Sequence, residues 1–262
     1  MKKELLLILM FSVVGLVTSA WSDTAIISQN FDDTGIFSPS VTSAGDASTI
    51  GGRWTLMQAD PGDGTLSGIR TAHSHSATQA LSVYRGGSYP IASVTNGIDI
   101  ASTPNFEYQF WIYRANSDAS AVALLENSET IATGSGKLNT SVYIQEGNIM
   151  VHPGGTWVDT NADIAVGVWT RVRMSFDMSS GDYGAYTLYI MPEGQAETEV
   201  WTGDLTTSAR TVLNAIRFNP QGTTGGQTYI DDISLTIVPE PTAMMLLGLG
   251  SIGVLIGRKR HV

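Results

Sequence analysis

The stretch Phe106–Arg114 constrains the fold of this chain more than any other segment. Its sequence, FEYQFWIYR, alternates between two sets of side chains. Successive residues of a β-strand point to opposite faces of a sheet, so each set shares one face. The first set is apolar or aromatic: Phe106, Tyr108, Phe110 and Ile112. The second set mixes polar and aromatic groups: Glu107, Gln109, Trp111 and Tyr113. The segment therefore predicts a central strand with one face in the core. Its other face is directed toward the rim of the protein or toward a ligand.

The same period of two recurs along the chain. In Trp169–Phe176, Val172, Met174 and Phe176 are predicted to point inward and the arginines between them outward. Ala185–Met191 then returns antiparallel after a turn. Further strands are expected at Ala25–Phe31, Arg53–Gln58, Ala80–Tyr84, Ala121–Leu125, Ser141–Gln145, Ile149–His152, Thr198–Thr202, Ala215–Asn219 and Thr228–Ile237, with loops at Ile36–Gly52 and Ala59–Ser76. No window shows a long helical period. Many short strands separated by turns predict an all-β sandwich.

The N-terminal stretch Met1–Ala20 has the features of a secretory signal peptide. Lys2 and Lys3 provide a charged start, Leu5–Val17 is an apolar core, and three small residues at 18–20 suit cleavage. An uncleaved N-terminal anchor is the alternative. Removal of this stretch and of the C-terminal segment leaves a sandwich domain at 21–237, which is long enough to form its own core.

The C-terminal stretch Val238–Val262 joins three different kinds of segment. Pro239, Glu240 and Pro241 form a tripeptide that is expected to be extended, because proline disfavours helix in the residue before it. Residues 242–257 carry no charge. They would span about 24 Å as a helix, slightly less than the roughly 30 Å core of a bilayer. A basic cluster follows: Arg258, Lys259 and Arg260. These charges favour the cytoplasmic side, which places the domain outside. A buried core helix is the alternative.

The order of Pro239-Glu240-Pro241, apolar run and Arg258-Lys259-Arg260 resembles the PEP-CTERM sorting signal of Gram-negative bacteria. The resemblance implies processing near the tripeptide by an exosortase-type membrane protease. Members of this family are typically exported proteins of species that produce exopolysaccharide. The resemblance therefore implies a location in the cell envelope or outside the cell, with transient or permanent membrane anchoring through the C-terminal segment.

The composition is acidic and lacks cysteine. The formal net charge is −10, which disfavours binding to the phosphate backbone of nucleic acids. The absence of cysteine excludes disulfides, thiolate metal sites and cysteine nucleophiles. An exported domain of this size can rely on its hydrophobic core instead of disulfides.

Several short motifs of the chain resemble a known class of β-sandwich, and Phe110–Tyr113 is one of them. The others are Gly167–Val172 leading to Tyr186–Ile190, the closing Tyr229–Leu235, and Ser76–Leu81. Together they resemble laminin-G-like or concanavalin-A-like jelly rolls and carbohydrate-binding modules of exported bacterial proteins. The resemblance implies a jelly-roll β-sandwich over residues 25–237. Galactose-binding-like jelly rolls share the closing motif, so the superfamily stays open.

The closing strand offers a candidate metal site. The period of two would place Asp231 on one face with Tyr229, Ile233, Leu235 and Ile237. A buried carboxylate needs hydrogen-bond partners or a metal. In the jelly rolls that the chain resembles, two such acidic residues can share a structural calcium, and Asp32 or Asp33 would pair with Asp231 here. The alternative is that these aspartates accept hydrogen bonds from backbone amides.

Three aromatic residues are candidates for stacking on sugar rings. Trp157 lies in a predicted loop, and Trp111 and Tyr113 lie on the mixed face of the central strand. Ordinary packing in the sandwich is the alternative for all three. His73 and His75 would share a face in a strand and could chelate a metal, but the small polar residues around them favour a surface loop.

No catalytic motif is evident. The chain has neither a Gly-x-Ser-x-Gly nor a His-Glu-x-x-His pattern, nor the carboxylate or Gln-x-His runs used by glycosidases and lyases of the jelly-roll fold. We therefore expect a non-catalytic, exported β-sandwich that binds exopolysaccharide or another glycan, or that serves as a structural surface protein. The alternative is a polysaccharide hydrolase or lyase on the same fold.

Overall fold

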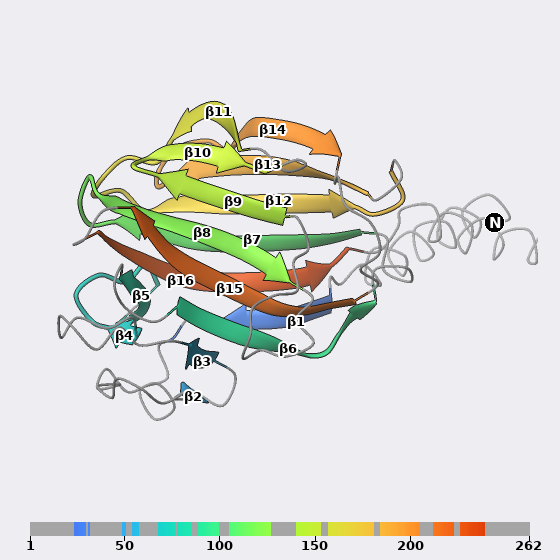
Figure 1. Cartoon of the computed structure of the whole chain (residues 1–262), viewed down its shortest axis with the longest axis horizontal. Coiled ribbons are helices and arrows are strands. Elements are labelled where there is room, and N and C mark those ends of the chain that lie inside the picture. Colours follow the sequence, from blue (N-terminus) through green and yellow to red (C-terminus); the bar gives the residue numbers. More distant parts are fainter. Residues whose placement is uncertain are drawn as a thin grey trace, which may run out of the picture.

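The computed structural model describes residues 24–29, 31, 49–50, 54–57, 68–76, 78–84, 89–99, 105–126, 140–152, 157–180, 184–204, 212–222 and 226–238. The regular elements of these ranges are β-strands, which form two sheets (Figure 1). The same ranges contain no helix that is long and apolar enough to cross a membrane. The predicted all-β sandwich is therefore confirmed. The predicted signal peptide and, beyond Val238, the C-terminal segment lie outside the described residues.

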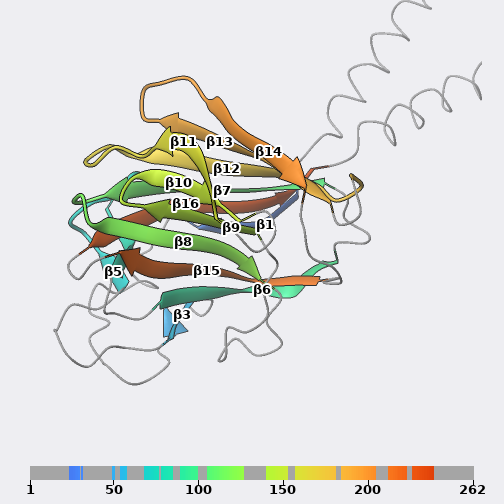
Figure 2. The same ribbon diagram turned by 45° about the horizontal axis from the view of Figure 1, so that its top comes forward.

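Each sheet contains eight strands. Sheet A has the order β14-β13-β12-β7-β16-β5-β4, and β1 also pairs with β16. Its strands are β1 Thr24–Gln29, β4 Gly68–Arg70, β5 Ala80–Tyr84, β7 Asn105–Arg114, β12 Thr170–Asp177, β13 Ala185–Pro192, β14 Thr198–Asp204 and β16 Gln227–Ile237. Sheet B has the order β11-β10-β9-β8-β15-β6-β3-β2. Its strands are β2 Thr49–Ile50, β3 Trp54–Met57, β6 Tyr89–Asp99, β8 Ala119–Glu126, β9 Thr140–Gln145, β10 Asn148–Val151, β11 Val158–Asp163 and β15 Val212–Gly222. On one side of the molecule, β11 and β14 contact each other (Figure 2).

The core lies between the inner faces of the two sheets, and it confirms the predicted alternation. In β7 the residues of the predicted apolar face are completely buried. In β12 the exposed fractions of Val172, Met174 and Phe176 are at most 2%. Aromatic rings of neighbouring strands stack, as Phe106 does on Phe176 at 4.4 Å between ring centroids. The antiparallel pair predicted from the sequence, β12 with β13, is present, and β9 also pairs antiparallel with β10. The β9–β10 turn has positive φ at Glu146 and Gly147, as a type I′ hairpin requires.

Four strands have no counterpart among the predicted ones. The longest is β6, whose Pro90 and Asn96-Gly97 are signals for turns. A register shift in its ladder to β15 absorbs Asn96-Gly97, because Ser93 pairs with Ala215 whereas Ile98 pairs with Leu213, and Pro90 pairs with Leu56 of β3. β11 is a polar edge strand without an apolar period, and β2 and β4 are short strands within stretches predicted to be loops.

The prediction that Asp231 shares one face of β16 with Ile233, Leu235 and Ile237 is wrong, because a β-bulge interrupts the strand. Asp231 pairs with Trp111 of β7, but the next pair joins Ser234 to Gln109, so two residues of β16 oppose one of β7. Asp232 takes a positive φ of 46° at this point. The bulge reverses the alternation. Asp231 therefore faces outward with Trp111, while Ile233 and the apolar residues after it face the core.

The two ends of the described domain meet at one end of sheet A. Thr24 of β1 pairs with Ile237 of β16, and the amide N of Val238 donates to the carbonyl O of Asn105 at 3.0 Å. We call this the tail end. At the opposite, far end, β7 finishes at Arg114, which is buried and donates to the carbonyl oxygens of Ser117, Ala119 and Ile164. This guanidinium joins β7 to β8 and to the segment after β11.

Candidate functional site

The outer face of sheet A is the candidate functional surface because it carries the mixed row of β7. Opposite Trp111 lie Arg171 of β12 and Asp231 of β16, and opposite Gln109 lies Arg173. From the tail end to the far end this face carries three groups of side chains. We call them the groove, the ion network and the aromatic cluster.

The aromatic cluster occupies the far half of the face. Its members are Trp111, Tyr113, Trp169 and Tyr229. Two histidines of the β4–β5 connection stack on it. The ring of His75 lies 3.8 Å from that of Trp111, centroid to centroid, at an angle of 17°, and the ring of His73 lies 4.4 Å from that of Tyr113. Trp111 and Tyr113 are therefore half-buried beneath imidazole rings. The two histidines lie in a loop, as predicted, and each stacks on a different ring.

The β-bulge holds this connection in place. Oδ2 of Asp231 accepts hydrogen bonds from the backbone amides of His75, at 2.9 Å, and Ser76, at 3.3 Å, while Oδ1 accepts from the amide of Asp232. Oδ2 of Asp232 lies 2.6 Å from Nδ1 of His75. Burial raises the pKa of Asp231 from 3.8 to about 6, and the amide donors oppose that rise. The neighbouring carboxyl groups of Asp231 and Asp232 thus hold residues 73–76 against the sheet.

The ion network lies in the middle of the face. Arg173 makes a two-pronged contact with Glu197, through Nε at 2.9 Å and Nη2 at 2.6 Å, and its Nη1 lies 2.7 Å from Oε1 of Glu107. Arg171 reaches the same Glu197 at 2.9 Å. The hydrogen bond between Arg173 and Glu197 raises the pKa of the arginine and lowers that of the carboxyl group. Tyr189 places its ring 4.0 Å from the guanidinium of Arg173. Both arginines are therefore matched by carboxylates.

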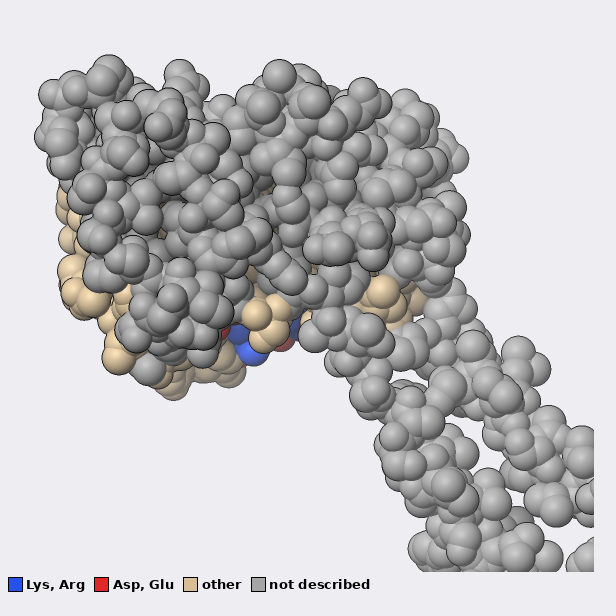
Figure 3. Space-filling model, turned by 90° about the horizontal axis from the view of Figure 1, so that it is seen from below, with Lys and Arg blue, Asp and Glu red and all other residues tan. Residues whose placement is uncertain are grey.

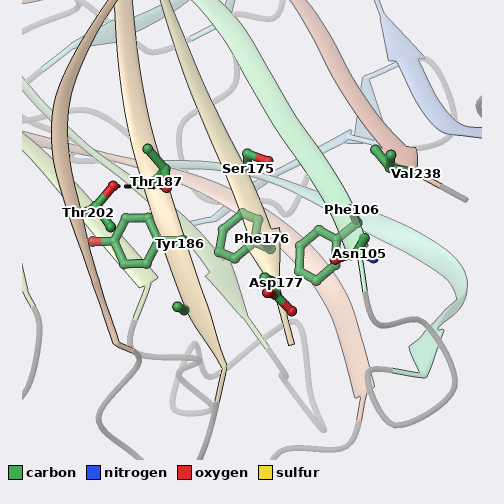
Figure 4. A pocket seen from close by; sticks show the side chains of 10 residues that line it. Asn105, Phe106, Ser175, Phe176, Asp177, Tyr186, Thr187, Thr202 and Val238 are labelled. Carbon is green, nitrogen blue, oxygen red and sulfur yellow. Dashed lines mark hydrogen bonds between the residues drawn. The ribbon is translucent and has the colours of Figure 1, made fainter. Parts of the chain in front are cut away.

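The groove lies at the tail end of sheet A and has a volume of about 470 Å³. Ser175, Thr187 and Thr202 line it from three neighbouring strands, and Val238 lines it beside β7 (Figure 4). The hydroxyl of Thr202 donates to that of Thr187 at 2.9 Å. The remaining lining residues are Asn105, Phe106, Phe176, Asp177, Ala185 and Tyr186. Because the outward residues are small, the groove offers hydroxyl groups and methyl groups with little bulk. Ser175 and Thr187 are two residues from Arg173 and Tyr189, so the groove adjoins the ion network.

Trp157 does not join the other two predicted ligand-binding residues. Its ring makes edge contacts with Tyr143 of β9 and with His152, at centroid distances of 5.3 Å and 4.9 Å. Tyr143 alternates with buried neighbours, so these rings lie on the outer face of sheet B. The Trp157 side chain is 40% exposed. The structure therefore separates Trp157 from Trp111 and Tyr113, which lie on sheet A.

The calcium hypothesis stays a prediction. Asp32 and Asp33 lie outside the described residues, so their distance to Asp231 is not part of the structure. Both oxygens of Asp231 accept backbone hydrogen bonds, which agrees with the alternative that the sequence left open. In the part of the chain that the structure describes, no three His, Asp or Glu side chains converge as they would around a metal ion.

Several residues of the face were not singled out by the sequence. Glu197 lies in the turn before β14, and only the fold brings it to two arginines of β12. The outward pointing of both arginines was predicted correctly, but their partners depend on tertiary pairing. Seen from the side of β2, β3 and β6, blue and red atoms of the described residues lie next to each other in one small area (Figure 3).

Comparison with solved structures places the fold in the class of jelly-roll β-sandwiches. The chain is similar to the marine PL-14 alginate lyase from Aplysia kurodai, with 11% identity, a TM-score of 0.52 and coverage of 82% of this chain and 100% of the lyase. It is also similar to a carbohydrate esterase of a Shiga toxin-encoding bacteriophage, phi24B, with 13% identity, a TM-score of 0.51 and coverage of 83% and 100%. The chain spans about half the length of the botulinum neurotoxin receptor-binding domains that it also matches. No curated protein sequence matches the chain.

A sorting signal follows this domain. Residues 238–260 match the family model of the PEP-CTERM protein-sorting motif. The motif confirms the resemblance of the C-terminal segment. It implies export, a C-terminal membrane anchor before cleavage, and processing by an exosortase, which is a membrane protease. The chain is thus a sorted surface protein built on a jelly-roll β-sandwich.

Proposed function

We propose that this surface protein binds a neutral polysaccharide on the outer face of sheet A and catalyses no reaction on it. The observation that carries the proposal is the groove of about 470 Å³ beside the ion network. Its volume lies within the roughly 300–1,000 Å³ of small-molecule sites. Sugars present hydroxyl groups together with apolar C–H surfaces. The threonine and serine hydroxyls and the methyl groups of the groove offer complementary contacts.

A neutral glycan suits this face better than an anionic one. Arg171 and Arg173 already contact Glu197 and Glu107, so the network has no excess of positive charge to offer a carboxylate. The whole chain carries a formal charge of −10, which repels polyanions. Glu107, at the border of the groove, has a partly exposed carboxylate that can accept hydrogen bonds from sugar hydroxyls. Two similar structures are named for action on carbohydrates, which supports a glycan as the class of ligand.

The test is a binding assay with the full-length protein in detergent. Neutral polysaccharides such as dextran and galactan are compared with alginate at low and at physiological salt. We expect binding to a neutral polymer with little dependence on salt, and weaker binding to alginate. Ser175→Tyr, which fills the groove, should weaken binding at least tenfold. Gln145→Tyr, an exposed outward position of sheet B, is the matched control and should bind like the wild type.

Three results would overturn this function. Equal binding by Ser175→Tyr and the wild type would remove the groove from the site. Loss of binding in Trp157→Ala alone would move the site to the outer face of sheet B. Release of new reducing ends or unsaturated sugars during incubation would replace binding with the alternative, a hydrolase or lyase on the same fold.

A further inference from the structure

A short segment covers the aromatic cluster on the outer face of sheet A. It consists of residues 71–76 of the β4–β5 connection, and we call it the strap. The imidazole of His75 stacks on Trp111 and meets Trp169 nearly edge-on, at 66° and with 5.6 Å between the ring centroids. Its Nδ1 lies 2.6 Å from the carboxylate of Asp232. This imidazole therefore lies on an aromatic face and contacts a carboxylate at the same time.

The second ring of the strap lies on the sheet in a similar way. His73 stacks on Tyr113 and meets Tyr229 at 71°, with 4.8 Å between the ring centroids. Trp111 and Tyr113 are successive outward positions of β7, so they are about 6.6 Å apart along the strand. The strap thus places two flat rings side by side on one strand.

A sugar ring forms the same two kinds of contact. Its C–H face packs on an aromatic ring, and its hydroxyl groups donate hydrogen bonds to carboxylates. Beneath the strap, Trp111 and Tyr113 provide the aromatic faces. Asp231 and Asp232 provide carboxylate oxygens, which contact the strap in the closed structure. The two imidazole rings therefore occupy the positions that two sugar rings of a polymer would take.

The strap can leave the sheet without disturbing the core. Its side chains other than the two imidazoles are small, and none of its six residues is fully buried. The strand before it, β4, has three residues and pairs in the described sheet with β5 alone. Segments that bury little apolar surface open at a low cost in free energy. Because the aromatic cluster lies on the outer face, opening of the strap leaves the packing between the two sheets intact.

The aromatic cluster is continuous with the groove along the strands. On β13, Tyr189 and Met191 follow Thr187 of the groove as outward positions. Met191 pairs with Arg171, which in turn pairs with Trp111 of the cluster. Thr187 and Met191 are four residues apart, or about 13 Å along the strand. A polymer that lies in the groove and follows the strands therefore reaches the aromatic cluster.

We propose that the aromatic cluster is a second sugar subsite for the neutral polysaccharide of the groove, and that the strap inhibits this subsite until the polymer displaces the two imidazole rings. The inference rests on the proposed function, since both subsites take the same polymer. A site that is open in only a fraction of the molecules has an apparent affinity reduced by that fraction. Removal of the imidazole rings should therefore strengthen binding.

The first test is titration of the full-length protein in detergent with dextran and with galactan. The double variant His73→Ala with His75→Ala should bind the polymer at least fivefold more tightly than the wild type. The gain should disappear when Trp111→Leu is added, because the stacking surface is then lost. Thr71→Ala, an exposed strap position outside the ring contacts, is the control and should bind like the wild type.

Hydrogen exchange of the wild type provides an independent measurement, which does not depend on the folding of any variant. The amides of His75 and Ser76 donate to Asp231 in the closed structure. They should exchange faster in the polymer complex, because the strap is displaced there. A polymer that covers the closed strap would slow their exchange instead.

The outcomes separate this inference from the proposed function. Unchanged or weaker binding by the double variant, while Ser175→Tyr still weakens binding, would overturn the second subsite and leave the groove in place. A gain that persists with Trp111→Leu would also overturn it, since stacking would not be its source. Slower or unchanged exchange at His75 and Ser76 in the saturated complex would contradict displacement of the strap. Failure of the wild type and the double variant to bind either polymer would overturn the proposed function and this inference with it.

Discussion

The two faces of β7 show how differently one strand can be used. On its inner face Phe106, Tyr108, Phe110 and Ile112 are all completely buried between the sheets. On its outer face the alternate residues are half-buried: Glu107 contacts an arginine, and Trp111 and Tyr113 each stack with a histidine ring. The packing of the inner face is stabilised by the exclusion of water from apolar side chains. The environment of the outer face is determined by the distant segments that lie across it, and these segments decide which groups the surface offers to a ligand.

The sharpest way to break this comparison is to truncate one residue on each face. Phe110→Ala should lower the free energy of unfolding by about 3–5 kcal/mol, because it leaves a cavity among aromatic neighbours. The outward neighbour Gln109→Ala should change it by no more than about 0.5 kcal/mol. Urea unfolding of both variants measures the difference. Similar losses at the two positions would show that the outer face is part of the core.

The pH dependence of stability tests the buried carboxyl group on the outer face. The folded-state pKa of Asp231 is about 6, above its ordinary value of 3.8, so the native state binds more protons between these values. Its contribution to stability is complete below pH 3.8 and is lost as the pH rises through 6. The loss amounts to roughly 3 kcal/mol. The difference in unfolding free energy between wild type and Asp231→Asn should therefore fall by that amount between pH 4 and pH 7.

The same titration distinguishes the two interpretations of Asp231. A calcium ion bound to this carboxylate would lower its pKa and make the wild type gain stability, relative to the variant, as the pH rises. Measurements with a chelator and with added calcium should give the same falling curve if the aspartate only accepts backbone hydrogen bonds. A rise with calcium alone would contradict a purely hydrogen-bonding role for Asp231 and support the predicted metal site.

The histidine that covers the outer face should have a smaller effect. His75→Ala removes the stacking on Trp111 and the contact with Asp232, which together contribute about 1 kcal/mol. Trp111 should become more accessible, so acrylamide quenching of tryptophan fluorescence should increase. This increase should vanish in a Trp111→Phe background. An unchanged quenching curve would show that the ring of His75 does not shield Trp111.

Much of the fold follows from local patterns. Period-two alternation identifies β7, β12 and β13 because each buries a full apolar face, and the Glu146-Gly147 turn specifies its hairpin. β6 escapes such a pattern because Asn96-Gly97 is absorbed by a register shift in the ladder to β15 and Pro90 pairs with Leu56 of β3. The alternation of β16 also fails beyond its bulge. Asp231 and Asp232 give no local signal for a bulge, which depends on the pairing with β7.

The candidate surface is less accessible to prediction from sequence. The mixed face of β7 indicates that Trp111 and Tyr113 point away from the core, and that is correct. The histidine rings that cover Trp111 and Tyr113 cannot be predicted from the sequence. His73 and His75 contact them only because tertiary hydrogen bonds to the bulge hold their loop in place. The groove is also unpredictable, since small residues from three strands form it only once the strands are in register. Trp157 and Trp111 are both candidates for sugar stacking in the sequence, yet Trp157 contacts Tyr143 of the other sheet.

Hydroxyl-radical footprinting of the full-length protein, with and without the neutral polysaccharide that it binds, tests the central claim most directly. We predict that the bound polymer protects Tyr189 and Met191 on the outer face of sheet A and leaves Trp157 and Tyr143 on sheet B at their unbound rates. Protection of Trp157 and Tyr143, with unchanged labelling of Tyr189 and Met191, would contradict the assignment of the binding surface to sheet A.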